Sequence, residues 1–570
     1  MPNAKQSHAF TNHPLFPVIL SAAPFLAYIW ASPLRDLYGL ETRNGLFAKV
    51  MLTDGPGLIP AIMGKPYPDY PPLYFWFSWL FSLPAGQVST FSAVLPSALA
   101  AGAMVGLTFL LGKHTSFRTG LIAALVLAAC PDYWLKAERA TIDMLLALWV
   151  SLAVFFLYCR HNGHQKTQGN LPETAAFLMM FLAFLTKGPV GLVLPMGIWS
   201  TFLLVEKKWR QLLYFSLKSL VLAACSIGVE LLFLRQAGDS VLVKNVFEMQ
   251  FAARVGQKAN EPVFYYILYL LRGAAPWWIL ACFGLAPGYR KDAAGNKLKD
   301  LASDFFSRQT MRLAACWFFF VLVLFSAAST RHSRYLLPLF PALFLMIGGG
   351  IELAFEKRIF HLKRNSTSFL KYLFFLITAV ATAVYVAAPL SYRPPLLYWL
   401  IWFSLTISAF ILIHRKAGQN FLFLSLALLC IVSAMTAEGM LVEPWISHQE
   451  SGRQFVRETE AKVENNIPIV FYKIDSDGDG IKYALYSHRR SESLSFTESP
   501  TGLAGIALPF VLVAFENAKN ELSFLDHGKT AKELSQGLLH NSRIRSWLIE
   551  DSGPGRHENQ TTDNFSLPRE

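Results

Sequence analysis

Long apolar runs separated by short polar segments make up the first three-quarters of the chain. A helix needs about 20 apolar residues to cross the hydrocarbon core of a bilayer, and somewhat fewer suffice inside a helical bundle. The pattern therefore predicts a mainly α polytopic membrane protein over residues 1–438. We expect about 13 transmembrane helices, near residues 14–34, 92–112, 119–131, 142–159, 174–186, 189–205, 212–234, 276–289, 313–328, 335–354, 370–389, 396–414 and 420–438.

Residues 439–570 have a different character. They contain 33 charged residues in 132 positions, whereas the preceding 438 positions contain 56. Pro468–Ile474 and Leu508–Phe515 are short, apolar and rich in β-branched or aromatic residues, as buried strands are, and Gln449–Val463 has a helical pattern. We therefore expect a small soluble α/β domain over 439–570, with a disordered end from residue 552.

Positive charge is distributed unevenly between alternate loops. One set of loops carries 21 Lys and Arg residues over about 86 positions, and the opposite set carries 15 over about 129. Because cytoplasmic loops are the more basic ones, the N-terminus is predicted to be cytoplasmic and, with an odd number of spans, the C-terminal domain periplasmic. Topology thus accounts for the net charge of +13, and nucleic acid is not expected as a partner.

The loops on the predicted outer side carry the residues of chemical interest. Residues 35–91 form a first long outer loop, whose stretches Glu41–Leu52 and Leu73–Leu83 have the pattern of interfacial amphipathic helices. Residues 235–275 form a second long loop on the same side. Charged side chains near membrane depth are costly and usually functional, so their convergence predicts a polar cavity open to the outside.

Two acidic segments stand out in these loops. Glu41-Thr42-Arg43 opens one predicted interfacial helix, and Asp69 lies in a proline-stiffened turn before the next. Their carboxylates suit catalysis, but Glu41 and Arg43 are equally expected to pair with each other or with solvent. Arg139 and Asp143 are four residues apart and, on one helical face, would form either a salt bridge or part of a site.

Cationic side chains are the second feature of the outer side. Lys187 lies at the edge of a span, where snorkelling to the surface is the alternative to a functional role. Guanidinium groups suited to bidentate phosphate binding come from Arg254, Arg272, Arg331 and Arg334. A polyprenyl-phosphate sugar donor fits this layout, because cations would stabilise the leaving phosphate while a carboxylate acts as general base or holds a divalent cation. The rival function is a transporter that binds such a lipid without chemistry, although no duplicated halves are visible.

Seven short motifs follow one another in a specific order: Glu41-Thr42-Arg43, Asp69-Tyr70-Pro71-Pro72-Leu73-Tyr74-Phe75-Trp76, Leu95-Pro96-Ser97-Ala98, Arg139-x-x-x-Asp143-Met144, Leu185-Thr186-Lys187-Gly188, Pro276-Trp277 and Tyr335-Leu336-Leu337-Pro338. In this order they resemble the ArnT/protein O-mannosyltransferase group of GT-C integral-membrane glycosyltransferases, and most closely its bacterial 4-amino-4-deoxy-L-arabinose transferase branch. The resemblance covers residues 14–355. It implies a GT-C fold and inverting sugar transfer from undecaprenyl phosphate to lipid A or another envelope glycan, at the periplasmic side of the bacterial inner membrane. Transfer to protein is the alternative within the same group.

The resemblance also implies roles for individual residues. Glu41, Asp69 and Asp143 are expected to be catalytic, with a divalent metal ion at Glu41 and Asp69 left open. The donor phosphate is expected to meet Arg43, Arg139, Lys187, Arg254, Arg272, Arg331 and Arg334, and the substrates to meet Tyr70, Tyr74 and Tyr335. Two positions depart from the group, because Leu40 replaces the first Asp of an acidic pair and Tyr70 replaces a Lys. If that Asp is the base elsewhere in the group, its role passes here to Glu41 or Asp69.

Overall fold

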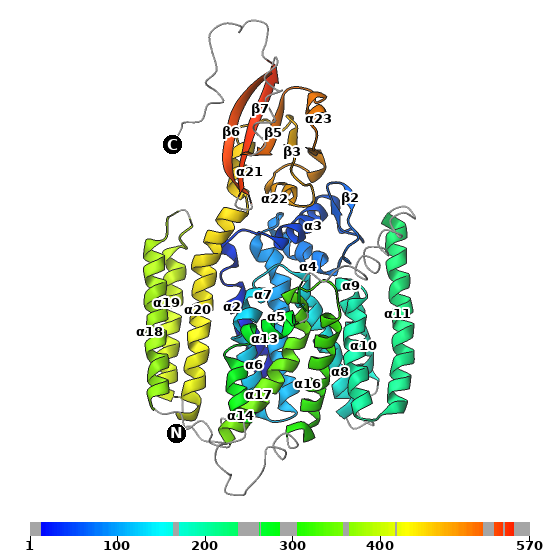
Figure 1. The fold of residues 1–570 in the computed structure, drawn as a ribbon, viewed down its shortest axis with the longest axis vertical. Helices are drawn as coiled ribbons and strands as arrows, with labels where there is room; N and C mark the ends of the chain where they lie inside the picture. The colour runs from blue at the N-terminus through cyan, green and yellow to red at the C-terminus, as the bar shows by residue number, and fades with distance from the viewer. Residues whose placement is uncertain are drawn as a thin grey trace. The chain divides into compact units, whose positions relative to one another are not determined.

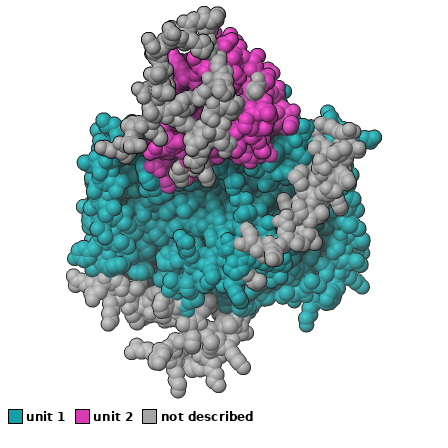
Figure 2. Space-filling model, turned by 45° about the horizontal axis from the view of Figure 1, so that its top comes forward, with its two compact units in different colours: residues 1–61, 66–445 teal, residues 62–65, 446–570 magenta. Residues whose placement is uncertain are grey.

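The structure, a computed structural model, describes residues 13–162, 170–237, 261–262, 264–285, 305–356, 364–390, 392–416, 419–516, 529–539 and 542–551. The chain divides into two compact units, residues 1–61 with 66–445 and residues 62–65 with 446–570 (Figure 2). The first unit thus extends to Trp445, beyond the end expected at residue 438 for the membrane domain. The last membrane helix continues past the apolar run from which that end was predicted.

The first unit is helical (Figure 1). Each of the thirteen predicted ranges falls on a helix: α2 (Phe16–Ile29), α5 (Thr90–Lys113), α6 (Phe117–Ala128), α8 (Ile142–Asn162), α9 (Leu171–Lys187), α10 (Val190–Val205), α11 (Trp209–Ala237), α14 (Trp277–Leu285), α16 (Gln309–Ser326), α17 (Phe340–Glu356), α18 (Arg364–Ala387), α19 (Leu396–Lys416) and α20 (Gln419–Glu450). Shorter elements are η1 (Ser32–Leu34), α7 (Pro131–Ala137), α13 (Tyr265–Gly273) and η4 (Ser333–Leu339).

Not all of these helices are long enough to cross a membrane alone. Within the described ranges, nine have the length and apolar composition of a span. The number is ten if α6 and α7, which meet at a bend of 63°, count as one span. The multi-pass architecture is thus confirmed, whereas the number thirteen is not.

Glycines allow the helices around α5 to pack closely. A methyl group at Gly112 of α5 would lie 2.5 Å from the Cα of Gly120 on α6, and one at Gly106 would lie 2.9 Å from the backbone oxygen of Pro17 on α2. Such close approach is the usual basis of helix association in membranes. α5 consequently contacts α2, α6 and α8 and forms the centre of the unit.

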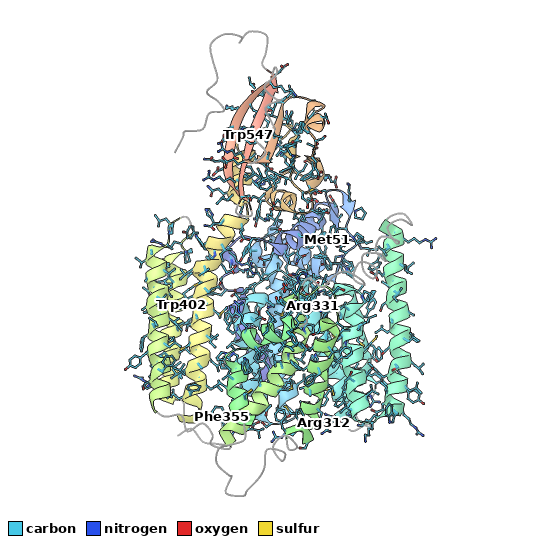
Figure 3. All side chains as sticks on the ribbon, viewed as in Figure 1. Met51, Arg312, Arg331, Phe355, Trp402 and Trp547 are labelled. Atoms are coloured by element: carbon cyan, nitrogen blue, oxygen red, sulfur yellow. The ribbon has the colours of Figure 1, made fainter. Side chains whose placement is uncertain are left out.

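Helices α18, α19 and α20 pack together through aromatic residues and reach the end of α2. Tyr385 and Trp399 stack with their ring centroids 4.7 Å apart. Trp402, labelled in Figure 3, donates a hydrogen bond to Thr436 at 2.8 Å. Ala31, after α2, belongs to the same buried cluster. These contacts fix the direction of α20 relative to the loop that follows α2.

The first long loop folds back as two helices, as the sequence predicts. α3 (Leu40–Asp54) and α4 (Leu73–Ser82) are followed by the short turn η2 (Leu83–Ala85), and two-residue strands β1 (Ala61–Ile62) and β2 (Lys65–Pro66) lie between them. The rings of Phe47 on α3 and Phe75 on α4 lie 4.6 Å apart, and α4 packs on α5. The loop therefore rests on the ends of the membrane helices.

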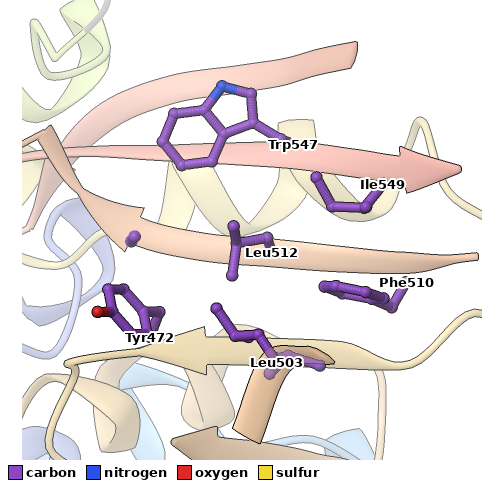
Figure 4. Close-up of a cluster of buried hydrophobic side chains, with 8 residues drawn as sticks. Tyr472, Leu503, Phe510, Leu512, Trp547 and Ile549 are labelled. Carbon is purple, nitrogen blue, oxygen red and sulfur yellow. The ribbon is translucent and has the colours of Figure 1, made fainter. Parts of the chain in front are cut away.

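The second unit is an α/β domain with sheet order β4-β3-β5-β7-β6. β3 (Ile469–Tyr472), β4 (Leu494–Thr497) and β5 (Phe510–Phe515) are parallel, and β6 (Lys529–Leu539) and β7 (Ser542–Asp551) form an antiparallel hairpin beside β5. Side chains such as Leu512 and Trp547, which are paired in register, form the core on one face (Figure 4). The other elements are α21 (Arg453–Glu460), α22 (Asp479–Tyr486), η5 (Ser491–Ser493) and α23 (Pro500–Ala504).

The two strands predicted in this domain are confirmed as β3 and β5. The predicted helix Gln449–Val463 is wrong in its continuity, because α20 ends at Glu450 and α21 begins at Arg453. Gly452 lies between them with φ of +68°, a conformation that interrupts an α-helix and favours glycine. The end predicted to be disordered, residues 552–570, lies outside the described residues.

Candidate functional site

A buried cluster of charged side chains surrounds Glu41. It consists of Arg35, Tyr38, Glu41, Arg139 and Glu443 and is called the Glu41 cluster below. Arg35 donates to both Glu41 carboxylate oxygens, at 2.7 and 2.9 Å, and Arg139 Nη1 lies 3.3 Å from Oε2. The Arg35 and Glu41 side chains are only 2% and 3% exposed. Glu41 is therefore held between two guanidinium groups.

The first turn of α3 docks on the break between α7 and α8. The backbone N–H of Ala140, in that break, donates to Glu41 Oε1 at 2.7 Å. Asn44, one turn along α3, donates to the backbone oxygen of Ala140 at 2.7 Å. Ser97 of α5 binds both backbone groups of Thr141. Side chains thus form hydrogen bonds with the backbone groups of Ala140 and Thr141, which belong to no helix.

This break corrects two interpretations of the sequence. Arg139 and Asp143 do not share a helical face, because α7 ends at Ala137 and α8 begins at Ile142. Glu41 pairs with Arg35 and Arg139 instead of Arg43, which donates from Nη1 to the Tyr67 hydroxyl at 3.0 Å. Burial alone would raise the pKa of the Glu41 carboxyl, but Arg35, Arg139 and the Ala140 N–H together hold this pKa below its ordinary value.

A second cluster is centred on Asp143. It consists of Asp143, Lys187, Arg334 and Tyr335 and is called the Asp143 cluster. Lys187 Nζ donates to Asp143 Oδ1, and Arg334 Nε lies 3.3 Å from Oδ2. Lys187 Nζ also lies 4.2 Å from the centre of the Tyr335 ring. With two cations and one carboxylate, the Asp143 cluster carries one net positive charge.

Helix ends position the members of the Asp143 cluster. Asp143 lies in the first turn of α8 and Lys187 is the last residue of α9, so each charge lies at the helix end that favours it. Gly188 ends α9 with φ of +67°, and its N–H donates to the Phe184 oxygen at 2.7 Å. Arg334 and Tyr335 come from η4. Lys187 therefore has specific partners, unlike a side chain that only snorkels.

Asp69 and Tyr70 lie in the turn before α4. Tyr70 lies near Tyr335 and Asp143, and burial, together with these two neighbours, raises the pKa of its hydroxyl. Within the described part of the chain, no ion pair to Asp69 is formed. Among the described residues its carboxylate has no cationic partner, in contrast to those of Glu41 and Asp143.

A small, open pocket adjoins Tyr70. Its walls come from the segment before α4 and from the ends of α9 and α11. They are mostly apolar, and Glu230 is their one charged residue: Leu58, Ile59, Pro68, Tyr70, Pro71, Pro72, Phe184, Leu185, Glu230, Phe233 and Leu234. The pocket therefore presents a mostly apolar surface next to Tyr70.

Other residues proposed from the sequence lie elsewhere. Tyr74 is fully buried, and its hydroxyl is bonded to the Ala93 oxygen and to Ser97, each at 3.0 Å, so it is a packing residue of α4. Arg331, labelled in Figure 3, donates to the backbone oxygens of Glu261 and Ser326 and so joins the segment before α13 to the end of α16. Arg272 is exposed on α13, and Arg254 lies outside the described residues.

The residues proposed for a divalent metal do not fit one. Both oxygens of Glu41 are occupied by guanidinium or backbone N–H groups, whose positive charge would repel a cation. Among the residues that the structure describes, no group of three or more His, Cys, Asp or Glu could hold a metal ion.

Sequence reasoning missed three members of the Glu41 cluster: Arg35, Tyr38 and Glu443. Arg35 and Tyr38 lie in the same loop as Glu41, where the charge of Arg35 was the available signal. Glu443 lies 405 positions after Tyr38, on a helix with a mostly apolar sequence. Its charge at the end of an apolar run was the available signal.

The fold and these clusters define a multi-pass membrane protein with buried charged clusters at the ends of its helices. A family model described as dolichyl-phosphate-mannose-protein mannosyltransferase matches residues 69–232. The chain is 25% identical over 357 residues to the undecaprenyl phosphate-alpha-4-amino-4-deoxy-L-arabinose arabinosyl transferase of Yersinia enterocolitica, which covers 60% of each chain. It is 26% identical over 414 residues to the protein of that name from Shewanella sediminis, covering 71% of this chain and 72% of the other.

Solved structures show the same fold. ArnT from Cupriavidus metallidurans bound to undecaprenyl phosphate matches with a TM-score of 0.64 and 18% identity, over 93% of this chain and 97% of that one. Its apo form matches with a TM-score of 0.63. The resemblance to ArnT-like GT-C glycosyltransferases is thus confirmed. The matched region spans about 60% of the length of several of these curated relatives.

Proposed function

We propose that the chain is an integral-membrane glycosyltransferase that moves a sugar from an undecaprenyl-phosphate donor to lipid A or another envelope glycan. The observation that carries this proposal is the Asp143 cluster, whose net positive charge lies beside Tyr70 and the apolar pocket. A lipid phosphate needs both features, cations for its head and an apolar surface for its chain. The sugar 4-amino-4-deoxy-L-arabinose is the leading candidate, because relatives are named for it.

Lys187 and Arg334 bind the donor phosphate in this proposal. The bond between the sugar C1 and the phosphate oxygen breaks, and its electron pair leaves with undecaprenyl phosphate. Two fixed cations stabilise the charge that develops on that oxygen. Asp143 takes no part in the bond changes. It holds both cations in place so that little reorganisation is needed during the reaction.

Asp69 is the proposed general base. Glu41 and Asp143 are bound by cations, which leaves Asp69 as the sequence-predicted carboxylate without an ion pair in the described part of the chain. It accepts the proton of an acceptor hydroxyl as the acceptor oxygen forms its bond to C1. Attack from the face opposite the phosphate inverts the configuration at C1.

The distribution of basic residues supports a site at the periplasmic surface of the inner membrane. A cytoplasmic N-terminus follows from the Lys and Arg bias of alternate loops and places α3, α4 and both clusters at the periplasmic surface of the inner membrane. Acceptor and undecaprenyl-phosphate sugar would meet there. The family model that matches residues 69–232 is named for protein mannosyl transfer, so a protein acceptor is the second candidate.

The test is a transfer assay with full-length protein in lipid nanodiscs. Labelled undecaprenyl-phosphate sugar is supplied with lipid A in one arm and with envelope protein in another. We expect label on lipid A, and a loss of about 100-fold or more in kcat for Asp69→Asn.

Asp54→Asn is the matched control, because Asp54 is an exposed carboxylate at the end of α3. It should transfer sugar like the wild type. Label on protein alone would shift the acceptor to the second candidate. Donor binding without transfer to any acceptor would overturn the enzymatic proposal in favour of a transporter, and full activity of Asp69→Asn would overturn its role as the base.

A further inference from the structure

Glu443 connects the last helix of the first unit to the Glu41 cluster. It lies on α20, 304 positions after Arg139. Its carboxylate accepts Arg139 Nη2 at 2.7 Å on Oε1 and the Tyr38 hydroxyl at 2.8 Å on Oε2. Arg35 Nε lies 3.9 Å from Oε2. A single buried carboxylate thus touches three members of the cluster.

Arg139 is the member of the Glu41 cluster that can reach a ligand. Its side chain is 25% exposed, whereas those of Glu41 and Glu443 are 3% and 5% exposed. Its shorter ion pair is with Glu443, at 2.7 Å, and its longer one is with Glu41, at 3.3 Å. The guanidinium also stacks on Tyr38, 4.2 Å from the ring centre. Glu443 and Tyr38 therefore define its position more closely than Glu41 does.

We propose that Glu443 is a positioning residue that holds the Arg139 guanidinium as a third cation for the donor phosphate, in addition to Lys187 and Arg334. This inference rests on the proposed function. The Glu41 cluster has two guanidinium groups and two carboxylates and is neutral. Without the charge of Glu443, Arg139 is drawn toward Glu41, which Arg35 already occupies in the buried part of the cluster. The guanidinium then leaves the position from which it contacts phosphate.

The alternative is that Glu443 only anchors α20 to the loop after α2. Glu443→Gln separates the two roles, because glutamine keeps the size and an acceptor for Tyr38 but removes the charge that holds Arg139. We expect kcat/KM for the donor to fall about ten- to hundredfold, and affinity for undecaprenyl phosphate to fall with it.

A double-mutant cycle with Arg139→Gln tests whether the effect passes through Arg139. In the Arg139→Gln background, Glu443→Gln should change neither kcat/KM nor affinity for undecaprenyl phosphate. Arg139→Gln alone leaves Glu443 buried without the closer of its two cations and should lower the thermal midpoint. Adding Glu443→Gln should raise it again, a recovery that can be measured without enzymatic activity.

Trp30→Phe is the control for helix anchoring. Trp30 Nε1 donates to Met440 Sδ at 3.1 Å, and its ring centroid lies 5.0 Å from that of Tyr398. Trp30 thus joins the end of α2 to α20 through contacts that do not involve Arg139. This variant should keep kcat/KM within about twofold of the wild type. Equal losses from Glu443→Gln with and without Arg139, or a matching loss in Trp30→Phe, would overturn the positioning role. If the wild type transfers no sugar, the proposed function fails, and the same cycle on undecaprenyl phosphate affinity decides the role of Glu443.

Discussion

Lys187, the last residue of α9, forms an ion pair with Asp143 in the first turn of α8 and lies over the ring of Tyr335 from η4. Three elements therefore meet at one ammonium group. Asp143 also holds Arg334, so the carboxylate neutralises one of the two cations and leaves a single positive charge. A site of this kind is preorganised for an anion, because its cations are already oriented before the ligand arrives.

Replacing Lys187 by Met should remove that net charge. We expect the KM for the undecaprenyl-phosphate donor and the inhibition constant of undecaprenyl phosphate to rise by about ten- to a hundredfold, because a charge-assisted contact to phosphate is lost. The remaining Arg334–Asp143 pair is neutral. The measurement is steady-state kinetics in nanodiscs at fixed ionic strength.

Lys218→Met is the control for this prediction. Lys218, on α11, also forms an ion pair, with Glu173 at 2.6 Å, but its side chain is 55% exposed. Both constants should stay at wild-type values. An unchanged inhibition constant in Lys187→Met would show that Lys187 does not bind the phosphate.

Gly188→Ala should affect both stability and donor binding. Gly188 has φ of +67°, so a side chain there costs about 1–2 kcal/mol and pushes the end of α9 toward another conformation. Lys187 immediately precedes it, and the donor KM should rise as Lys187 shifts. The thermal midpoint and the donor KM are measured together.

Gly228→Ala makes the same chemical change in a helix interior. A methyl group at Gly228 of α11 would meet nothing within 4 Å. Because alanine is the better helix former by about 1 kcal/mol, the thermal midpoint should stay or rise, and the donor KM should not change. A Gly188→Ala variant that matches Gly228→Ala in both measurements would contradict a role for the backbone at Gly188.

The sequence predicted elements well where a single local signal determines them. Apolar runs located thirteen helices, and β-branched runs located β3 and β5. Partners within the site could not be predicted in the same way. The break between α7 and α8 separates Arg139 from Asp143, and nothing in their four-residue spacing reveals it. Glu443 joins the site only because α20 packs beside the loop after α2, which depends on tertiary contacts of residues such as Trp402 and Ala31.

Tyr74 illustrates the limit of a motif. It lies within the aromatic stretch that resembles the family and was expected to contact substrate, but its hydroxyl is buried against α5. Tyr74→Phe should lower the free energy of unfolding by about 1 kcal/mol through the lost hydrogen bonds. The folded protein should keep the wild-type kcat/KM for the donor. A kcat/KM that falls while the thermal midpoint stays unchanged would return Tyr74 to the substrate site.

Glu41→Gln should reveal the stability that the Glu41 cluster contributes and its dependence on pH. Removing one partner of a buried ion pair costs about 3–5 kcal/mol, so the thermal midpoint should fall clearly at neutral pH. The pKa of Glu41 is lowered in the folded protein. Its contribution is therefore fully present above the unfolded pKa, about 4.3, and is lost as the pH falls through the folded value.

The expected result is a difference in thermal midpoint between wild type and Glu41→Gln that stays constant from pH 8 to about pH 5 and narrows below about pH 4.3. Glu173→Gln, which breaks the exposed pair with Lys218, should cost less than about 1 kcal/mol at neutral pH. A difference for Glu41→Gln that already narrows between pH 8 and 6 would mean that the carboxyl takes up a proton near neutrality. Glu41 would then be a candidate acid or base in the reaction instead of a fixed anion that holds Arg35 and Arg139.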